Sequence, residues 1–279
     1  KLKGFVTTGA SKRGWTTWLT TAVDPRVVAC APIVIDVLNM KPSMEHHWKC
    51  YGAYSSAVHD YVDYNIFDRM DTPEGAALRG FVDPYSFRAR YTMPKYIINA
   101  TGDEFFVLDS SQFYFDDLPG TKHLYYAPNS GHGMDVDMNA ILGLLNYYLT
   151  IARGQALPQF SWAFEGDNAV RVQIVDPVSS VYLWKATNPT ARDFRWYGGS
   201  GPYWTSTPLS ETSPGSGEYF AEVETPEEGW TAFYVQLVYA SGMEFCTQTC
   251  VTPAWLPFGG EGEGEGEGEG EGEGEGEGE

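Results

Sequence analysis

The spacing of apolar residues changes once along the chain, near residues 154–158. Before that point, short continuously apolar runs alternate with segments of helical period, a pattern typical of buried parallel strands joined by helices. Strands are predicted at 5–8, 27–35, 95–101 and 123–126. Helices are predicted at 16–23, 109–117 and 136–152, the last with Ile141, Leu144, Leu145, Tyr148 and Ile151 at helical spacing. Residues 1–157 are therefore expected to form an α/β domain.

Residues 39–92 interrupt this alternation. They hold helical segments rich in Tyr, Trp and His and lead into Asp83-Pro84-Tyr85. An insertion between strands of such a sheet usually lies over the strand ends, so we expect a helical cap. Its aromatic side chains either pack the cap onto the domain or line a substrate pocket, and we favour packing.

From residue 158 onward, apolar and polar residues alternate with a period of two. The alternating segments are 169–175, 180–186, 219–223 and 231–239, separated by turns of Gly, Pro, Ser and Asn. This pattern predicts an antiparallel β-sandwich domain over 158–257. Residues 258–279 are mostly a Glu-Gly repeat that can bury nothing, so we expect a disordered tail or a linker to a further module.

The net charge of −19 is dominated by the Glu-Gly repeat. Ten of the 37 acidic residues lie there, so residues 1–260 hold 27 acids against 18 bases, a net charge of −9. A moderately acidic chain without a basic stripe is a poor match for nucleic acid. No run approaches about 18 apolar residues, so no membrane span is expected.

The four cysteines lack the Cys-x-x-Cys spacing of a zinc or redox site. Cys30 lies in an apolar run and is expected to be a buried thiol, whereas Cys246 and Cys250 could close a small disulfide loop if the protein is exported. The chain starts at Lys1 and enters a strand almost at once. We therefore expect a fragment or a processed piece, to which a signal peptide would no longer belong.

The first strand ends in Gly9-Ala10-Ser11, and a helix-compatible stretch follows at once. A serine at a sharp strand-to-helix turn is the nucleophile elbow of an α/β-hydrolase. Glycine is needed two residues before the serine because strand and helix approach closely there. The backbone N–H of Lys12 would then point at a developing oxyanion. An ordinary tight turn produces the same short motif, so an acid and a base must be found elsewhere.

Both partners follow in the chain order that this fold requires, serine, acid, histidine. Asp103 comes directly after the strand at 95–101, and His132 lies in the loop after the strand at 123–126. The sequence thus predicts that His132 takes the proton of Ser11, that Asp103 holds the histidine tautomer, and that an acyl-enzyme forms and is hydrolysed.

Other acids and bases are weaker candidates. Glu104 would point away if Asp103 points in, and Asp109 lies too far into the next helix. The rival histidines are His46, His47, His59 and His123, of which the last begins a strand and the others lie in the cap. Adjacent histidines lack the spacing of metal ligands on a helix, so we expect no metal and no cofactor.

Five segments carry a family resemblance. They are Gly9-Ala10-Ser11-Lys12-Arg13-Gly14-Trp15-Thr16-Thr17-Trp18, Asp83-Pro84-Tyr85, Asn99-Ala100-Thr101-Gly102-Asp103-Glu104-Phe105-Phe106, Pro128-Asn129-Ser130-Gly131-His132 and Leu183-Trp184-Lys185-Ala186-Thr187-Asn188-Pro189. In these the chain resembles the PhoPQ-activated pathogenicity-related protein family over most of 1–257. The resemblance implies an α/β-hydrolase of the prolyl-oligopeptidase-like kind with a β-rich C-terminal domain, and an exported protein.

Two features depart from the usual hydrolase. Arg13 stands where the elbow usually has glycine, and it is expected either to form a structural ion pair, which we favour, or to assist the oxyanion or a carboxylate substrate. The strands that normally precede the nucleophile strand, with the second oxyanion donor, are absent. We therefore expect a partial hydrolase domain with an exposed edge beside the first strand, inactive or impaired as this piece alone.

These observations predict a secreted or periplasmic serine hydrolase that transfers the acyl group of an ester or peptide to water. An alternative is a hydrolase-fold binding or signalling protein with an idle triad. In a third interpretation the sandwich binds carbohydrate and the hydrolase is an esterase acting on it. That interpretation depends on four aromatic residues that we expect to be core or interface residues instead, Trp196, Tyr197, Tyr203 and Trp204.

Overall fold

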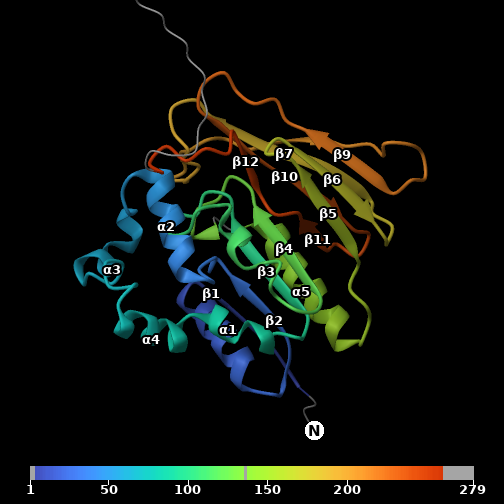
Figure 1. The fold of residues 1–279 in the computed structure, drawn as a ribbon. Helices are drawn as coiled ribbons and strands as arrows, with labels where there is room; N and C mark the ends of the chain where they lie inside the picture. Colours follow the sequence, from blue (N-terminus) through green and yellow to red (C-terminus); the bar gives the residue numbers. More distant parts are fainter. Residues whose placement is uncertain (1–3, 135–136, 260–279) are drawn as a thin grey trace, which may run out of the picture.

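One large sheet runs through the molecule and receives strands from both halves of the chain (Figure 1). The computed structural model describes residues 4–134 and 137–259. In spatial order the strands are β1 (Phe5–Ala10), β2 (Val27–Ile33), β3 (Lys95–Ala100), β4 (Lys122–Ala127), β11 (Glu244–Cys246), β10 (Trp230–Val238), β7 (Ser180–Asn188) and β8 (Thr205–Pro208), with β12 (Cys250–Thr252) also paired to β10. Strands β1 to β4 are parallel, and β11 joins β4 antiparallel at Cys246 and Leu124.

The parallel half is built from the four strands that the apolar runs predicted. β3 is buried along its whole length, and β4 is buried after its first residue, as continuously apolar runs require. Helix α1 (Lys12–Val23) packs on β1 and β2 through a face that includes Trp18, whose ring lies 4.9 Å from that of Tyr91. β1 lies at the edge of this sheet.

Two helical predictions differ from the structure. The helix expected at 109–117 is reduced to the 3-10 turn η3 (Ser110–Phe113), because Tyr114 and Phe115 turn into the core instead of continuing a helix. Helix α5 (Met138–Ala152) forms, but Ile141, Leu145 and Tyr148 are each about half exposed. The buried positions of the helix are Ala140, Gly143 and Tyr147 instead. A Cβ on Gly143 would lie 2.7 Å from the Tyr96 hydroxyl, so this approach needs glycine. Position 136, where this helix was expected to begin, lies outside the described residues.

Residues 39–92 form a layer of short helices over one side of the molecule (Figure 1). Its elements are α2 (Met40–Tyr51), η1 (Ser56–Val58), α3 (His59–Asp63), α4 (Pro73–Val82) and η2 (Pro84–Arg90). Several of its aromatic rings pack on one another. Tyr54 lies 4.2 Å from Phe67 and 5.2 Å from Trp48, measured between ring centroids.

The alternating segments after residue 158 divide between two sheets. β5 (Phe160–Glu165), β6 (Ala169–Ile174) and β9 (Glu218–Glu222) form a separate antiparallel sheet, whereas β7, β8, β10, β11 and β12 extend the main sheet. The small sheet covers β10, and Phe164 meets Phe233 edge to face there. The strands after residue 158 therefore do not form a separate pair of sheets, because most of them continue the sheet of β1 to β4 across the boundary near 154–158.

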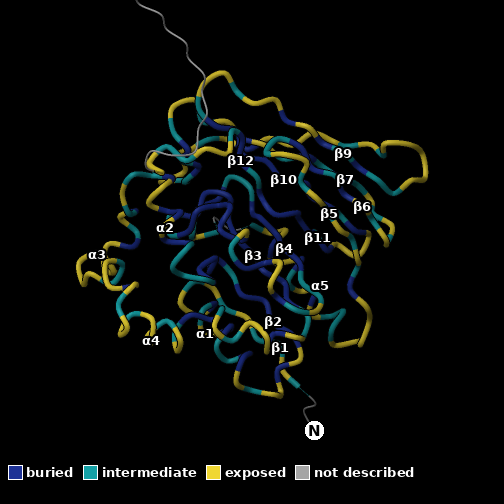
Figure 2. The backbone as a smooth tube through the Cα atoms, viewed as in Figure 1, coloured by how far each residue is buried: buried dark blue, intermediate teal, exposed yellow. Residues whose placement is uncertain are grey.

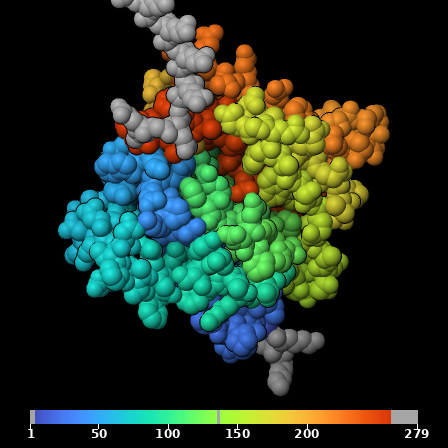
Figure 3. Space-filling view, in the orientation of Figure 1, coloured from blue at the N-terminus to red at the C-terminus, as the bar shows by residue number. Residues whose placement is uncertain are grey.

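The C-terminal segment returns to the cap, as the space-filling view shows (Figure 3). The N–H of Phe258 donates to the carbonyl of Lys49 at 3.0 Å, and its ring occupies the space that a Cβ on Gly52 would need. The burial map places the main sheet in the core, with exposed residues on the cap and the outer loops (Figure 2). All four cysteines are free thiols, including Cys246 and Cys250. Most of the expected tail, 260–279, lies outside the described residues.

Candidate active site

Ser11 sits at the bend between β1 and α1. Its φ of 52° and ψ of −125° are unusual for a residue other than glycine, and such strain is a feature of functional sites. The N–H of Ser11 donates to the carbonyl of Ile33 at 2.8 Å, which ties the bend to β2. A Cβ on Gly9 would lie 2.8 Å from the Cβ and the carbonyl oxygen of Arg13, so glycine is required at this position.

Asp103 and His132 come together with Ser11 in one chain of hydrogen bonds. The Nε2 atom of His132 lies 2.7 Å from the Ser11 Oγ atom. Its Nδ1 atom lies 2.8 Å and 3.0 Å from the two carboxylate oxygens of Asp103. Since a carboxylate only accepts, Nδ1 carries the proton when Asp103 is ionised, and the Ser11 hydroxyl then donates to Nε2. The three side chains lie on the loops after β1, β3 and β4.

Asp103 is buried, and several hydrogen-bond donors surround its carboxylate. The side chain is only 5% exposed, and burial raises the pKa of Asp103, while the hydrogen bond and charge of His132 oppose this rise. The carboxylate also accepts the N–H of Phe105 at 2.8 Å and that of Phe106 at 3.3 Å. These fixed donors hold the carboxylate in one orientation toward the histidine.

Glu104 does not replace Asp103 as the partner of the His132 imidazole, because its carboxylate binds the main chain of the histidine loop instead. Its carboxylate accepts the backbone N–H of His132 at 2.6 Å. The ring of Phe105 lies 4.1 Å from the imidazole and covers one side of it. Sequence reasoning had weighed Glu104 only as an acid. Its place next to Asp103 was the available signal that it faces the same loop.

The sequence profile of the PhoPQ-activated pathogenicity-related protein family matches residues 1–195, which include all three of these side chains. This chain belongs to that family. It is 34% identical to the autocrine proliferation repressor protein A of Dictyostelium discoideum over 286 residues. The match covers 92% of this chain and 58% of that protein, so the chain spans somewhat more than half the length of this relative.

Solved structures similar to this PhoPQ-related chain include one that is named an esterase and one that is named a peptidase. Acetyl xylan esterase 1 from a Thermoanaerobacterium species has a TM-score of 0.39 and 15% identity, over 53% of this chain and 45% of the esterase. The acylaminoacyl peptidase of Pyrococcus horikoshii has a TM-score of 0.40 and 13% identity, over 53% of this chain and 24% of the peptidase.

Lys12 and Arg13 open helix α1 directly after Ser11. Both residues are exposed, and no side chain caps the helix start, so backbone N–H groups of its first turn are free to meet an anion. Within the part of the chain that the structure describes, the Arg13 guanidinium forms no ion pair. The structural ion pair that we favoured for Arg13 is therefore not seen.

The rival histidines of this family member are engaged elsewhere. His46 binds Asp109, and the main-chain N–H of Ser55 donates to His47 at 2.9 Å. Burial lowers the pKa of His47 to about 4 and that of His123 to about 3, so both are neutral at physiological pH. His123 stacks on Phe245 with ring centroids 3.9 Å apart. Among residues 4–134 and 137–259, no cluster of three or more His, Cys, Asp or Glu side chains is arranged to hold a metal.

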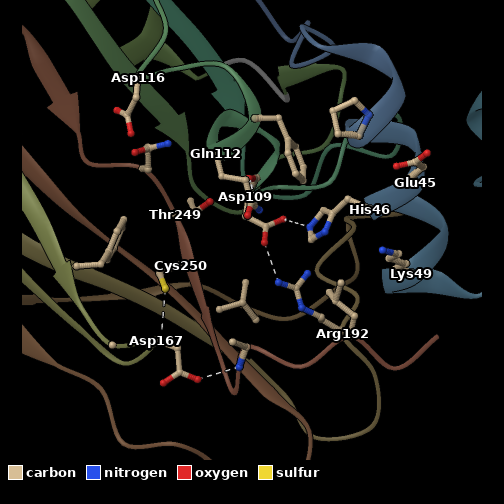
Figure 4. Close-up of a pocket in the computed structure, with 18 residues that line it drawn as sticks. Glu45, His46, Lys49, Asp109, Gln112, Asp116, Asp167, Arg192, Thr249 and Cys250 are labelled. Carbon is tan, nitrogen blue, oxygen red and sulfur yellow. Dashed lines mark hydrogen bonds and ion pairs between the residues drawn. The ribbon is translucent and has the colours of Figure 1, made fainter. Parts of the chain in front are cut away.

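A cavity of about 560 Å³ lies between the cap, the loop after β3 and the C-terminal strands. Figure 4 shows Asp109 between His46 and Arg192, with Thr249 and Cys250 nearby. Burial alone would raise the pKa of Asp109, but Arg192 and His46 outweigh it and hold this pKa below its ordinary range. Ser11 is not part of the cavity lining, so this cavity is distinct from the bend that carries Ser11.

Proposed function

We propose that the protein is a serine hydrolase that cleaves an ester or peptide bond through an acyl-enzyme. The continuous Ser11–His132–Asp103 hydrogen-bond chain is the observation that carries this proposal. Three residues of the required types, far apart in sequence and in the order of an α/β-hydrolase, meet at hydrogen-bond distance. The strained backbone at Ser11 supports the same role.

In this mechanism the imidazole of His132 takes the proton of Ser11 while the hydroxyl oxygen attacks the substrate carbonyl. Asp103 keeps Nδ1 protonated and stabilises the imidazolium that forms. The N–H of Lys12 stabilises the oxyanion, since it follows the nucleophile at the start of α1. His132 then protonates the leaving group, and water releases the acyl group with His132 again as base. The exposed guanidinium of Arg13 is available to bind a carboxylate on the substrate.

A second candidate function is signalling without catalysis. Its support is the name of the Dictyostelium relative, which describes an autocrine repressor of proliferation. In this alternative the hydrolase-like fold serves as a binding module and the Ser–His–Asp arrangement is unused. The same name, together with the family resemblance, supports a proposed location outside the cytoplasm. In the described part of the chain no helix is long and apolar enough to cross a bilayer.

A fluorophosphonate probe distinguishes the two functions, because it reacts with an activated serine whatever the natural substrate. We expect labelling of the protein and its loss in Ser11→Ala. Ser213→Ala is the matched control, since Ser213 is an exposed serine in the loop between β8 and β9. Labelling that persists in Ser11→Ala, or no labelling of a folded protein, would contradict the hydrolase proposal and favour signalling.

A further inference from the structure

The connection between β7 and β8, residues 189–204, leaves the C-terminal half of the main sheet and reaches the loops that carry Asp103 and His132. Below it is called the strap. A two-residue turn would have been enough to join neighbouring antiparallel strands. The strap is much longer, and besides its local hydrogen bonds it makes several polar contacts with residues distant in sequence. Its length therefore needs an explanation beyond the joining of two strands.

The strap holds the loop of the candidate acid on both sides of Asp103. Before it, the N–H of Trp196 donates to the carbonyl of Gly102 at 2.8 Å. A Cβ on Gly102 would lie 2.4 Å from the Cβ of Trp196, so the two backbones touch. After it, the Arg192 Nη2 atom lies 2.7 Å from Asp109, and both side chains are at least 94% buried (Figure 4).

The strap also holds the loop of the candidate base. The Asn129 amide donates to the carbonyl of Trp204 at 3.0 Å and accepts the N–H of Trp204 at 2.7 Å. This pair of bonds fixes the side chain of Asn129 against a main-chain segment, three residues before His132. Trp204 is itself anchored, since its ring is 1% exposed and lies 5.3 Å from Tyr234 of β10.

A third set of contacts connects the strap to the cap. The Arg195 guanidinium lies 3.9 Å from the ring centroid of Tyr51, and the hydroxyls of Tyr197 and Ser55 are 3.1 Å apart. Arg195 is fixed in turn by Asp193 at 2.5 Å. The strap is therefore held by the cap and the core in addition to the two loops.

We propose that the strap positions the active site, with Trp196 and the Asn129–Trp204 pair as positioning residues that set the separation of Asp103 and His132. This inference depends on the proposed function and extends it, because it makes the β-rich C-terminal region part of the catalytic apparatus. The loops of Asp103 and His132 bond to each other directly through Gly102 and Ser130 and through Glu104 and His132. The strap adds a second connection between them from outside, so neither loop can shift without breaking a polar contact.

Asn129→Gly tests this inference. Asn129 has a φ of 54°, which glycine adopts without strain, so the change removes the two bonds to Trp204 and leaves the backbone free to keep its conformation. We expect the rate constant of fluorophosphonate labelling to fall about 10- to 100-fold, since small misplacements of reacting groups have effects of this size. Asn129→Asp keeps an acceptor for the Trp204 N–H but places a carboxylate oxygen, which cannot donate, against the Trp204 carbonyl, so a fall is expected here as well.

Thr190→Ala is the matched control. It removes one side-chain hydrogen bond at an exposed position of the strap, from Thr190 to Asn188 at the end of β7, at 3.0 Å. We expect its labelling rate to be unchanged. The second readout is the low-field proton resonance of the His132 Nδ1–H bonded to Asp103, recorded on each variant without any probe. We expect this resonance to shift or broaden in Asn129→Gly and to be unchanged in Thr190→Ala.

The outcomes separate the two proposals. No labelling of the wild-type protein contradicts the hydrolase function, while the proton resonance still reports on the positioning. Wild-type labelling that is equally fast in Asn129→Gly, with an unchanged resonance, overturns the positioning role. Should Asn129→Gly not fold, Asn129→Asp decides by the same two measurements.

Discussion

Replacing Arg192 by methionine is expected to destabilise the fold far more than the same change at Arg171. Each arginine forms ion pairs, and the substitution keeps an unbranched apolar stem in both cases. The difference is burial. Arg192 and its partner Asp109 are 4% and 6% exposed, whereas Arg171 is 38% exposed and its partners Glu165 and Glu218 are 47% and 32% exposed.

Without Arg192, the buried carboxylate of Asp109 keeps its hydrogen bond with His46 but loses its guanidinium partner. Removing one partner of a buried pair costs about 3–5 kcal/mol of unfolding free energy, because the remaining charge is neither solvated nor neutralised. At Arg171 the two glutamates regain water, so little measurable change is expected. Urea unfolding at neutral pH, followed by tryptophan fluorescence, measures both changes.

The pH dependence provides a second check of the same reasoning. Because the folded pKa of Asp109 lies below the ordinary value, its ionised form stabilises the fold above the unfolded pKa, and this stability is lost as the pH falls below about 4. The difference in unfolding free energy between wild type and Arg192→Met should therefore become smaller in acid. Equal losses of unfolding free energy in the two arginine variants would refute this reasoning. A difference between wild type and Arg192→Met that stays constant down to pH 3.5 would refute it as well.

Three further outcomes follow from single residues. Gly9→Ala should lower the unfolding free energy by about 1–3 kcal/mol, since the added Cβ would lie 2.8 Å from Arg13. Gly80→Ala is the control, because no atom lies within 4 Å of its added Cβ, and it should not lower the unfolding free energy. Thermal unfolding of the two variants measures the difference. Burial raises the pKa of Asp36 to about 7, so the unfolding free energy should fall as the pH rises from about 4 to 7. Asp36→Asn should remove this pH dependence, as unfolding measurements between about pH 5 and pH 8 would show. Asp103→Asn should slow fluorophosphonate labelling by up to about 10⁴-fold with little change in stability, and a rate equal to wild type would contradict its orienting role.

The sequence predicted the three site residues together because of a topological regularity. Parallel strands present their carboxyl ends at one edge of the sheet, so the residues that follow them lie close together in space. Ser11, Asp103 and His132 each follow such a strand, and their order matched the fold. Glu104 was placed near the site but misjudged, because alternation along an extended chain does not describe a loop that turns directly after its strand.

The extent of the main sheet was not predictable in the same way. The segment of β10 was interpreted as one of the alternating strands of a sandwich, but all its residues except the last are buried. Its polar residues are satisfied inside the protein. Thr231 bonds Thr187 at 2.8 Å, and Gln236 accepts the indole N–H of Trp184 at 2.7 Å. A polar residue with a buried partner looks the same in sequence as one that faces solvent, so the pattern cannot distinguish a sandwich face from a central strand.

The contacts between the C-terminal region and the active-site loops include directional polar ones, which bears on why they exist. Apolar packing alone would hold the strap against the loops, but it tolerates sliding, because dispersion contacts have little directional preference. The Asn129–Trp204 bonds and the Arg192–Asp109 pair have narrow geometric requirements, and they are paired inside the protein. An unmade bond there leaves a buried polar group without a partner, which is costly. The polar contacts therefore add little stability compared with an apolar strap, but they define the position of the strap much more closely. A site that must keep Asp103 and His132 within hydrogen-bond distance requires such definite placement.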